Sequence, residues 1–243
     1  MHWYVPDDAR VHLFRYALAA RGLTSTNACM QAAELLGVPS VRLYQTSVFM
    51  KERGHGETSW HADLATSPFD TNSMVTCWIA LTRIDTEEDS PLEFASGSHR
   101  DLALPYWYSL DGMDKPSGDD REYDVDVHLP LAPGDATWHH GWLFHAAPPN
   151  DGRHDRLALA ISYVSASAHV LDTQDRHGLR RVPEDEDCES YMDWLQDMKG
   201  GDAVTHALLP VVFPPTMLAE PKLRRDTPGD KRRPHAEGPT ECG

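Results

Sequence analysis

Short strand-like segments, separated by clusters of Gly, Pro, Asn and Asp, occupy the middle of this 243-residue chain. Successive side chains of a strand point to opposite faces of its sheet, and turn-forming clusters between such segments are typical of antiparallel sheets. The segments cover residues 41–49, 74–82, 124–131, 135–145 and 157–165. This arrangement predicts a β sandwich or barrel at the centre of the chain.

Helical patterns flank this β region on both sides. In roughly residues 7–37, apolar side chains recur at helical spacing, and Gly37 provides a stop. Near the other end, Pro183 precedes four acidic residues. This combination favours a helix start, because proline suits the first helical position and acids stabilise the positive end of the helix dipole. Trp194 and Leu195 are expected on the buried face of that helix.

A single folded domain accounts for most of the chain. Although 243 residues suit one or two domains, one β barrel or sandwich often fills about 200–250 residues. We therefore expect one α+β domain, mainly β, over residues 1–219. It would have a helical part at 1–40, a β core at 41–172 and a C-terminal helical part at 173–219. Residues 220–243 are rich in proline and lack apolar periodicity, which predicts a disordered tail.

Acidic residues outnumber basic ones by 38 to 22, giving a formal net charge of −16. This charge argues against a nucleic-acid partner, since nucleic-acid binders present basic faces. A membrane partner is not expected either, because no apolar stretch is long enough to cross a bilayer. The four cysteines form no CxxC pair, and the first residues do not resemble a signal peptide. We expect a cytoplasmic protein that binds a small-molecule substrate.

A histidine and a carboxylate, His61 and Asp63, lie two residues apart in the segment Thr58–Asp63. On a strand, this spacing puts both side chains on the same face. With a second imidazole from elsewhere in the chain, the pair forms the two-histidine, one-carboxylate facial triad of non-haem Fe(II) oxygenases. Such a triad leaves the opposite coordination positions free for a cosubstrate and dioxygen.

The sequence leaves the third ligand open among several histidines, including His128, His139, His140 and His145. His139 shares a face with His145 in the segment 135–145. Six residues of strand span about 20 Å, so these two cannot bind one metal unless the strand breaks. His140 faces the other way, which favours a buried, hydrogen-bonded ring.

Turn-forming residues at 146–152 predict a hairpin whose returning strand starts near Arg156. The hairpin would place a guanidinium one strand away from the metal. Arginine offers a planar, two-pronged donor that suits a distal carboxylate. Ala158, Ala160 and Ser162 share the face of Arg156 and are small, which leaves room for a ligand. The alternative is a structural salt bridge from Arg156 to one of the many acidic side chains.

Several short motifs together resemble the phytanoyl-CoA dioxygenase family in order and spacing. They are Thr58–Asp63 (TSWHAD), Thr76–Leu81 (TCWIAL), Ser90–His99 (SPLEFASGSH) and Pro133–Asp135 (PGD), followed by His145, Pro149–Asn150, Arg156 and Tyr163. The resemblance covers residues 38–172 and is specific when the motifs are taken jointly. It implies a double-stranded β-helix core of the jelly-roll or cupin-like type, with flanking helices.

The same resemblance implies the cofactors and the residues that bind them. Fe(II) would be held by His61, Asp63 and His145, and the far carboxylate of the cosubstrate 2-oxoglutarate by Arg156. The further residues implied for the cosubstrate pocket are Lys51, Trp78, Ser59, Thr76 and Thr58. The sequence departs from the family pattern at Ala62, where glutamine is frequent, and at Ser90, where glycine often precedes Pro-Leu. Asp63 argues against a halogenase, since those relatives carry a small residue there.

The resemblance implies an Fe(II)/2-oxoglutarate-dependent dioxygenase that hydroxylates an unactivated C–H bond of a small molecule. Dioxygen and 2-oxoglutarate would be consumed, and succinate and CO2 released. Two alternatives stay open, a zinc-dependent hydrolase with the same three ligands and a cupin-like binding protein without turnover. The long aromatic segment 106–123 is expected to form a lid. Its acidic residues and the net charge favour a neutral or cationic substrate over polyanionic coenzyme A.

Overall fold

A computed structural model of the chain describes residues 26–102, 123–172 and 194–214. Most of the described elements are antiparallel strands, and an α-helix, α2, covers Thr26–Leu36. The larger sheet has five strands in the order β11 (Val211–Phe213), β1 (Val41–Lys51), β9 (Arg156–Ser165), β4 (Met74–Ala80) and β7 (Ala136–His140). The smaller sheet has four, in the order β2 (Thr58–His61), β8 (His145–Ala147), β5 (Glu93–Ala95) and β6 (Val125–Val127). A two-stranded sheet pairs β3 (Phe69–Asp70) with β10 (His169–Val170), and three short 3-10 helices are η1 (Asp63–Thr66), η2 (Glu87–Asp89) and η3 (Ser98–Asp101).

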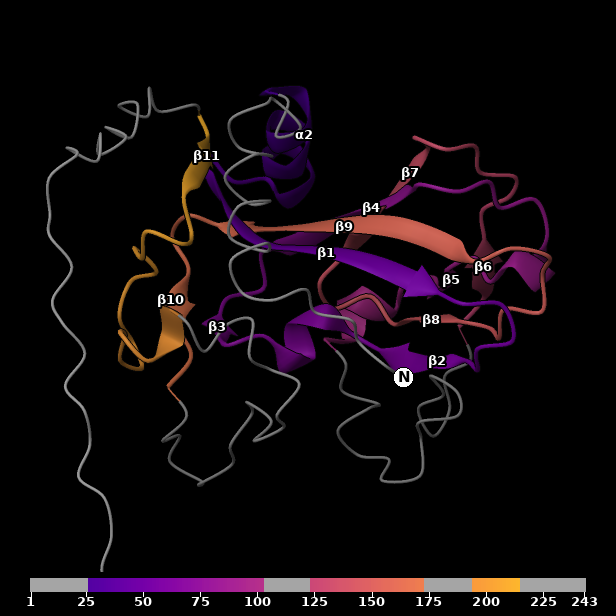
Figure 1. The fold of residues 1–243 in the computed structure, drawn as a ribbon. Coiled ribbons are helices and arrows are strands. Elements are labelled where there is room, and N and C mark those ends of the chain that lie inside the picture. Colours follow the sequence, from indigo (N-terminus) through magenta and orange to yellow (C-terminus); the bar gives the residue numbers. More distant parts are fainter. Residues whose placement is uncertain (1–25, 103–122, 173–193, 215–243) are drawn as a thin grey trace, which may run out of the picture.

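The two larger sheets lie face to face, and α2 packs on the outer side of the five-stranded sheet (Figure 1). This architecture confirms the mainly β, double-stranded β-helix type of fold with a flanking helix. Residues 41–51, 74–80 and 156–165 form strands close to the predicted bounds. No helix among the described residues is long and apolar enough to span a membrane.

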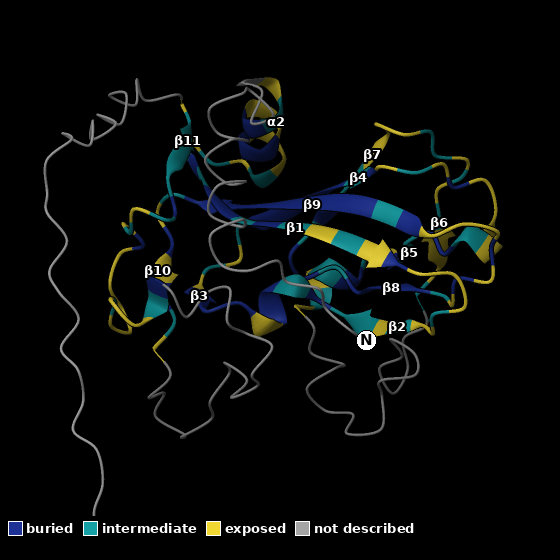
Figure 2. Ribbon diagram, viewed as in Figure 1, coloured by how far each residue is buried: buried dark blue, intermediate teal, exposed yellow. Residues whose placement is uncertain are grey.

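Strand β9 is the middle strand of the larger sheet and is buried along most of its length (Figure 2). Its two faces contribute to two different hydrophobic clusters. Leu159, Ile161 and Tyr163 point outward and pack with the buried residues of α2. Ala158 and Ala160 point inward and pack beside Trp78. The small residues therefore line the space between the two sheets, as the alternation predicts.

The segment 135–145 is not one strand, and this prediction was wrong. It forms β7 in the larger sheet and β8 in the smaller one, with a turn at Gly141 between them. The backbone of Gly141 donates to Met74 O and accepts from Leu64 N, both at 2.8 Å. A Cβ at this position would lie 3.0 Å from Leu64 Cβ and 3.1 Å from Met74 Cβ, so glycine permits the close approach that lets the chain change sheets.

The C-terminal part, expected to be helical, contributes a strand instead at its end. Val211–Phe213 pairs with β1 as β11, because a short apolar run with β-branched residues suits the open edge of that sheet. Trp194 is fully buried and stacks on Phe69 with ring centroids 5.5 Å apart. The predicted helical residues 7–25, the expected lid up to residue 122, the helix start at Pro183 and the tail at 220–243 lie outside the described residues.

Candidate metal centre

Three side chains from two segments of the chain meet at one end of the smaller sheet. His61 ends β2 and is paired across the strands with His145, the first residue of β8. Their ring centroids are 4.2 Å apart. Strand β2 stops at His61, but Ala62 keeps an extended backbone (φ −126°, ψ 126°), so Asp63 still returns to the side of His61. Ligand atoms of His61, Asp63 and His145 all lie within 4.8 Å of one another.

Backbone carbonyls set the orientation of both imidazole rings. Nδ1 of His61 lies 2.8 Å from Ser59 O, and Nδ1 of His145 lies 3.0 Å from Leu143 O. A carbonyl oxygen only accepts hydrogen bonds, so each Nδ1 carries the proton and donates it. Each Nε2 then keeps a free lone pair, which is the form of imidazole that binds a metal.

The two oxygens of Asp63 have different surroundings. Oδ1 faces the histidine pair, 3.8 Å from Nε2 of His61 and 3.6 Å from Nε2 of His145. Oδ2 accepts a hydrogen bond from Thr76 Oγ1 at 2.8 Å and lies 3.3 Å from Nε2 of His139. Ser67 Oγ donates to the backbone oxygen of Asp63 at 2.7 Å and fixes the start of η1. Oδ1 is therefore the oxygen available to a metal.

The protonation states of Asp63 and His145 suit the binding of a cation. Burial alone would raise the pKa of the Asp63 carboxyl, but neighbouring His145 and hydrogen-bonded His139 outweigh burial and hold that pKa well below its usual range. Burial, with His61 and His139 nearby, lowers the pKa of His145 to about 3. The carboxylate is thus ionised and the His145 ring neutral near pH 7, the states that metal ligands require.

The centre is buried on one side and open on the other. The side chain of His145 is 6% exposed, whereas that of His61 is 41% exposed. Phe94 of β5 closes the buried side, with its ring centroid 5.7 Å from that of His139 and 6.5 Å from that of His145. Among the described residues, the exposed side of the centre is therefore that of His61.

Arg156 is a buried cation, 7% exposed, at the start of β9. Its Nη1 donates to Ser90 O at 2.8 Å, and its Nε is buried without a partner. Within the described ranges no carboxylate forms an ion pair with it. Burial lowers its pKa to about 10, so the guanidinium is still charged near pH 7.

The guanidinium of Arg156 reaches back along the sheet towards the triad. It lies over the buried ring of Trp78, 5.3 Å from the centroid. Trp78 is two residues from Thr76 on β4, a separation of about 7 Å along a strand. Thr76 in turn contacts Asp63. The inner face of β4 thus runs from the Arg156 guanidinium at Trp78 to the Asp63 contact at Thr76.

Lys51 lies beside Arg156 in the pairing of β1 with β9. Its Nζ donates to Pro148 O at 2.6 Å, to Ala147 O at 3.1 Å and to Thr58 Oγ1 at 3.4 Å. Burial, together with the charge of Arg156, lowers the pKa of Lys51 to about 8. In this structure the ammonium therefore ties β1 to the smaller sheet, next to the expected cosubstrate pocket.

The other residues expected in the cosubstrate pocket occupy different places. Trp78 is buried between the sheets beside Arg156, and Thr76 holds the Asp63 carboxylate. The side chain of Ser59 is exposed, and its contribution to the site is the backbone oxygen that orients His61.

His139 is the residue whose place the sequence misjudged. The chain turns at Gly141, so the ring centroids of His139 and His145 lie 4.4 Å apart and not the length of a strand. Gly141 was the available signal, since an isolated glycine in a strand pattern often marks a bend. His140 points away from the centre, and its Nδ1 accepts a hydrogen bond from Trp142 N at 3.1 Å, as expected for a structural histidine.

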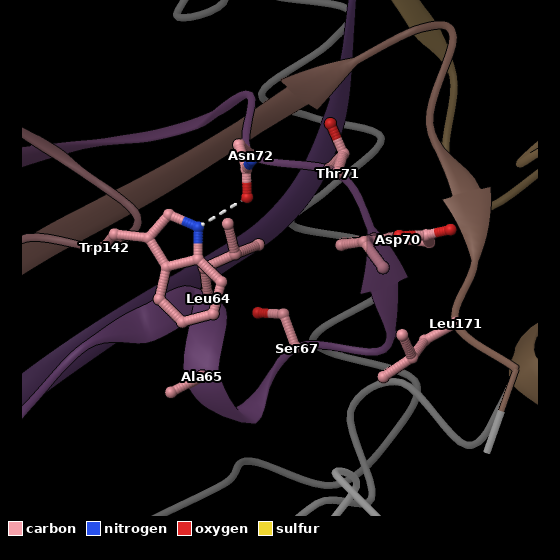
Figure 3. Close-up of a pocket in the computed structure, with 9 residues that line it drawn as sticks. Leu64, Ala65, Ser67, Asp70, Thr71, Asn72, Trp142 and Leu171 are labelled. Carbon is pink, nitrogen blue, oxygen red and sulfur yellow. Dashed lines mark hydrogen bonds between the residues drawn. The ribbon is translucent and has the colours of Figure 1, made fainter. Parts of the chain in front are cut away.

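A separate pocket of about 90 Å³ lies against η1 (Figure 3). Its lining residues are Leu64, Ala65, Ser67, Phe69, Asp70, Thr71, Asn72, Trp142 and Leu171. Trp142 Nε1 donates to Asn72 Oδ1 at 2.9 Å along one wall. Neither the triad side chains nor Arg156 line it, so this pocket is distinct from the candidate metal centre.

The donor set fits a divalent transition metal with open coordination positions. Two imidazoles and one carboxylate on one face are typical of non-haem Fe(II) sites. The guanidinium of Arg156 is buried and has no ion pair with the acidic residues that the structure describes.

Comparisons with known proteins agree with this geometry. A family model described as phytanoyl-CoA dioxygenase (PhyH) matches residues 6–158. Peroxisomal phytanoyl-CoA dioxygenase of Bos taurus is 26% identical over 191 residues, which are 70% of this chain and 54% of that protein. Methylphosphonate hydroxylase of Gimesia maris is 30% identical over 135 residues, 54% of this chain and 48% of that protein. The chain thus spans about half the length of these curated relatives.

Solved structures with a similar fold include the epimerase SnoN in complex with Fe3+, alpha ketoglutarate and nogalamycin RO. It is 26% identical, with a TM-score of 0.55, and the match covers 79% of this chain and 73% of that one. A carbocyclase from nogalamycin biosynthesis, SnoK, has a TM-score of 0.53 at 22% identity, covering 74% of this chain and 65% of that one.

Proposed function

The chain belongs to the phytanoyl-CoA dioxygenase family, and we propose that it is an Fe(II)/2-oxoglutarate-dependent dioxygenase that hydroxylates a C–H bond of a small molecule. One observation carries the proposal. The buried guanidinium of Arg156, which has no acidic partner among the residues that the structure describes, lies on the same inner sheet face as Thr76, the residue that holds Asp63. A metal site alone needs no such cation, whereas a metal site that binds a dicarboxylate does.

Each residue of the site has a defined part in this reaction. His61, Asp63 and His145 would hold the metal through two Nε2 atoms and Oδ1. Iron bound there supplies the oxidising chemistry, in which 2-oxoglutarate and O2 give succinate and CO2 and the substrate C–H becomes C–OH. Arg156 would bind the far carboxylate of 2-oxoglutarate and so fix the orientation of the cosubstrate.

The small side chains on the inner face of the larger sheet support a cosubstrate site there. Ala158 and Ala160 are small, and Trp78 beside them provides an apolar wall that excludes water from the Arg156 carboxylate contact. Lys51 would add positive charge at the same end. Exclusion of water strengthens charge-assisted hydrogen bonds, which favours tight binding of an anionic cosubstrate.

We propose a neutral or cationic small molecule as the substrate. The formal net charge of −16 disfavours a polyanion such as a coenzyme A thioester. The same charge disfavours a nucleic-acid partner. Cys29 and Cys77 are free thiols, which suits a reducing compartment such as the cytoplasm.

The test is an anaerobic titration of the purified chain with Fe(II) and 2-oxoglutarate. The proposal expects a weak visible charge-transfer band and, once air is admitted with a substrate, succinate. Asp63→Ala is expected to abolish both. Asp197→Ala is the matched control, because Asp197 is also paired with a histidine, His206, at 3.3 Å, but is not a member of the triad.

The outcomes separate the proposed dioxygenase from its alternatives. Absence of the band in the native chain contradicts the proposal, as does a band that persists in Asp63→Ala. Hydrolysis supported by zinc without 2-oxoglutarate would indicate the metal-dependent hydrolase. Cosubstrate binding without succinate for any tested substrate would indicate a binding protein.

A further inference from the structure

We propose that His139 and Thr76 are positioning residues that keep Asp63 bound to the metal through one oxygen only. The inference rests on the proposed metal site and concerns how many coordination positions that site leaves free. It follows from a row of three polar side chains across the larger sheet. Ser162 of β9, Thr76 of β4 and His139 of β7 lie side by side in the strand register.

Thr76 and His139 contact Oδ2 of Asp63 directly, and Ser162 is linked to it through the hydroxyl of Thr76. Thr76 Oγ1 donates to Oδ2 at 2.8 Å. Thr76 has a single hydroxyl proton, so Ser162 is the donor in the contact between the two hydroxyl groups at 3.0 Å. An ionised carboxylate only accepts, so His139 donates to Oδ2 from Nε2 at 3.3 Å.

The position of His139 favours a functional interpretation of this contact. The residue is 3% exposed, and its Nδ1 is buried without a partner. A buried polar atom without a hydrogen bond costs free energy, so a histidine placed for stability alone would satisfy both ring nitrogens. This ring satisfies only the nitrogen that faces Asp63.

His139 is better placed to hold Asp63 than to serve as a fourth ligand. The three residues whose ligand atoms lie within 4.8 Å of one another are His61, Asp63 and His145. His139 approaches the oxygen on the other side of the carboxylate, opposite to the one that faces the histidine pair. With Oδ2 occupied by two donors, only Oδ1 is free to bind a cation.

One-oxygen binding matters because the coordination positions are limited. An octahedral metal with three single-atom protein ligands keeps three positions, enough for a chelating 2-oxo acid and dioxygen. If Asp63 bound through both oxygens, one of these positions would be lost. By holding Oδ2 away from the metal, the row of Ser162, Thr76 and His139 thus keeps three coordination positions free.

The test compares His139→Phe and Thr76→Val with the native chain. Phenylalanine keeps a ring of similar size and valine keeps the branched shape, while both remove the donor to Oδ2. Co(II) is the probe, titrated anaerobically into metal-free protein, with affinity and the visible absorption of bound Co(II) as readouts. Neither readout depends on turnover.

We expect each substitution to weaken Co(II) binding by about 10–100-fold and to change the Co(II) absorption, because loss of a hydrogen bond to a ligand has effects of this size. Thr76→Ser restores the hydroxyl and is expected to recover most of the affinity. His140→Phe is the matched control, since this neighbouring histidine points away from the centre and is expected to leave both readouts at native values.

The melting temperature of the metal-free protein separates positioning from a structural role. If His139→Phe lowers this temperature but binds Co(II) within about twofold of native with the same absorption, the inference is overturned. The same conclusion follows if His140→Phe weakens binding as much as His139→Phe does. If Asp63→Ala still binds Co(II), the proposed metal site itself is wrong, which is a different failure.

Discussion

Replacement of Arg156 by methionine separates a cosubstrate-binding role from a structural one. The substitution keeps a long, unbranched side chain that can pack on Trp78 but removes the charge and the donors. In the native chain the guanidinium donates to Ser90 O, the one partner that the described residues provide, and its buried Nε has no partner. The structure therefore has an unused part of the guanidinium that a carboxylate of 2-oxoglutarate can occupy.

The expected loss of cosubstrate affinity is large. A charge-assisted hydrogen bond contributes about 1.5–3 kcal/mol, so a two-pronged contact contributes about 3–6 kcal/mol. At about 1.4 kcal/mol per factor of ten, the dissociation constant for 2-oxoglutarate rises by about 100-fold to 10,000-fold. This range assumes that both prongs bind the carboxylate.

The expected effect on stability is small, because opposing contributions nearly cancel. Burial lowers the pKa of Arg156 from 12.5 to about 10, so removal of the charge relieves about 3 kcal/mol. Loss of the bond to Ser90 O costs about 1.5–3 kcal/mol, and loss of the contact with the Trp78 ring costs about 0.5–2 kcal/mol. A structural ion pair would behave differently, since breaking one in the interior costs about 3–5 kcal/mol.

Calorimetry of the Mn(II)-loaded protein measures the dissociation constant for 2-oxoglutarate. Urea unfolding without cosubstrate measures the free energy of unfolding. Arg42→Met is the matched control. Arg42 is half-buried, and like Arg156 it donates to a carbonyl (Leu209 O, 2.8 Å) and has a buried Nε without a partner. It lies at the start of β1, whereas Arg156 is paired with Lys51 at the end of that strand. The reasoning is refuted if Arg156→Met binds 2-oxoglutarate as the native chain does, or if it loses more than about 3 kcal/mol of stability.

Two further predictions concern stability. The pKa of Lys51 in the folded protein, about 8, lies below its ordinary value of 10.5, so between these pH values the unfolded chain binds a proton that the folded chain does not. Lys51 therefore contributes a rise in the free energy of unfolding with pH across this window, of up to about 3 kcal/mol. Lys51→Met removes this contribution, so equal pH slopes in urea unfolding for the native and Lys51→Met chains would contradict the prediction. Gly141→Ala is expected to lose about 1–3 kcal/mol because its Cβ would meet Leu64 and Met74, whereas Gly56→Ala, which meets nothing within 4 Å, should unfold at the native urea concentration.

Those parts of the fold that depend on local patterns could be predicted from the sequence. The central strands follow from side-chain alternation, and the inner face of β9 follows from its small residues. The pairing of His61 with Asp63 is local as well, since it needs only an extended residue between them. The choice of His145 over the other histidines came from the family resemblance.

The other parts of the fold and of the site depend on contacts between segments that are distant in the sequence. The periodicity of apolar residues does not show these contacts. Strand β11 forms because the edge of β1 is open, and the sequence 211–213 does not show which strand it will pair with. The position of His139 depends on the change of sheets at Gly141, which the alternation of neighbouring residues conceals. The sequence therefore indicates the candidate metal ligands, which the structure brings together, more readily than the residues that orient them.

The change of sheets at Gly141 also explains why the centre lies where it does. A continuous strand would keep His139 and His145 in one sheet, with about 20 Å between them. Because the chain crosses, His145 reaches Asp63 from the smaller sheet and His139 reaches it from the larger one. The two oxygens of a single carboxylate thus face different sheets, and any shift of one sheet against the other changes the geometry of the metal ligands. The inter-sheet contacts of Lys51 and the close packing at Gly141 therefore bear on metal binding as well as on stability.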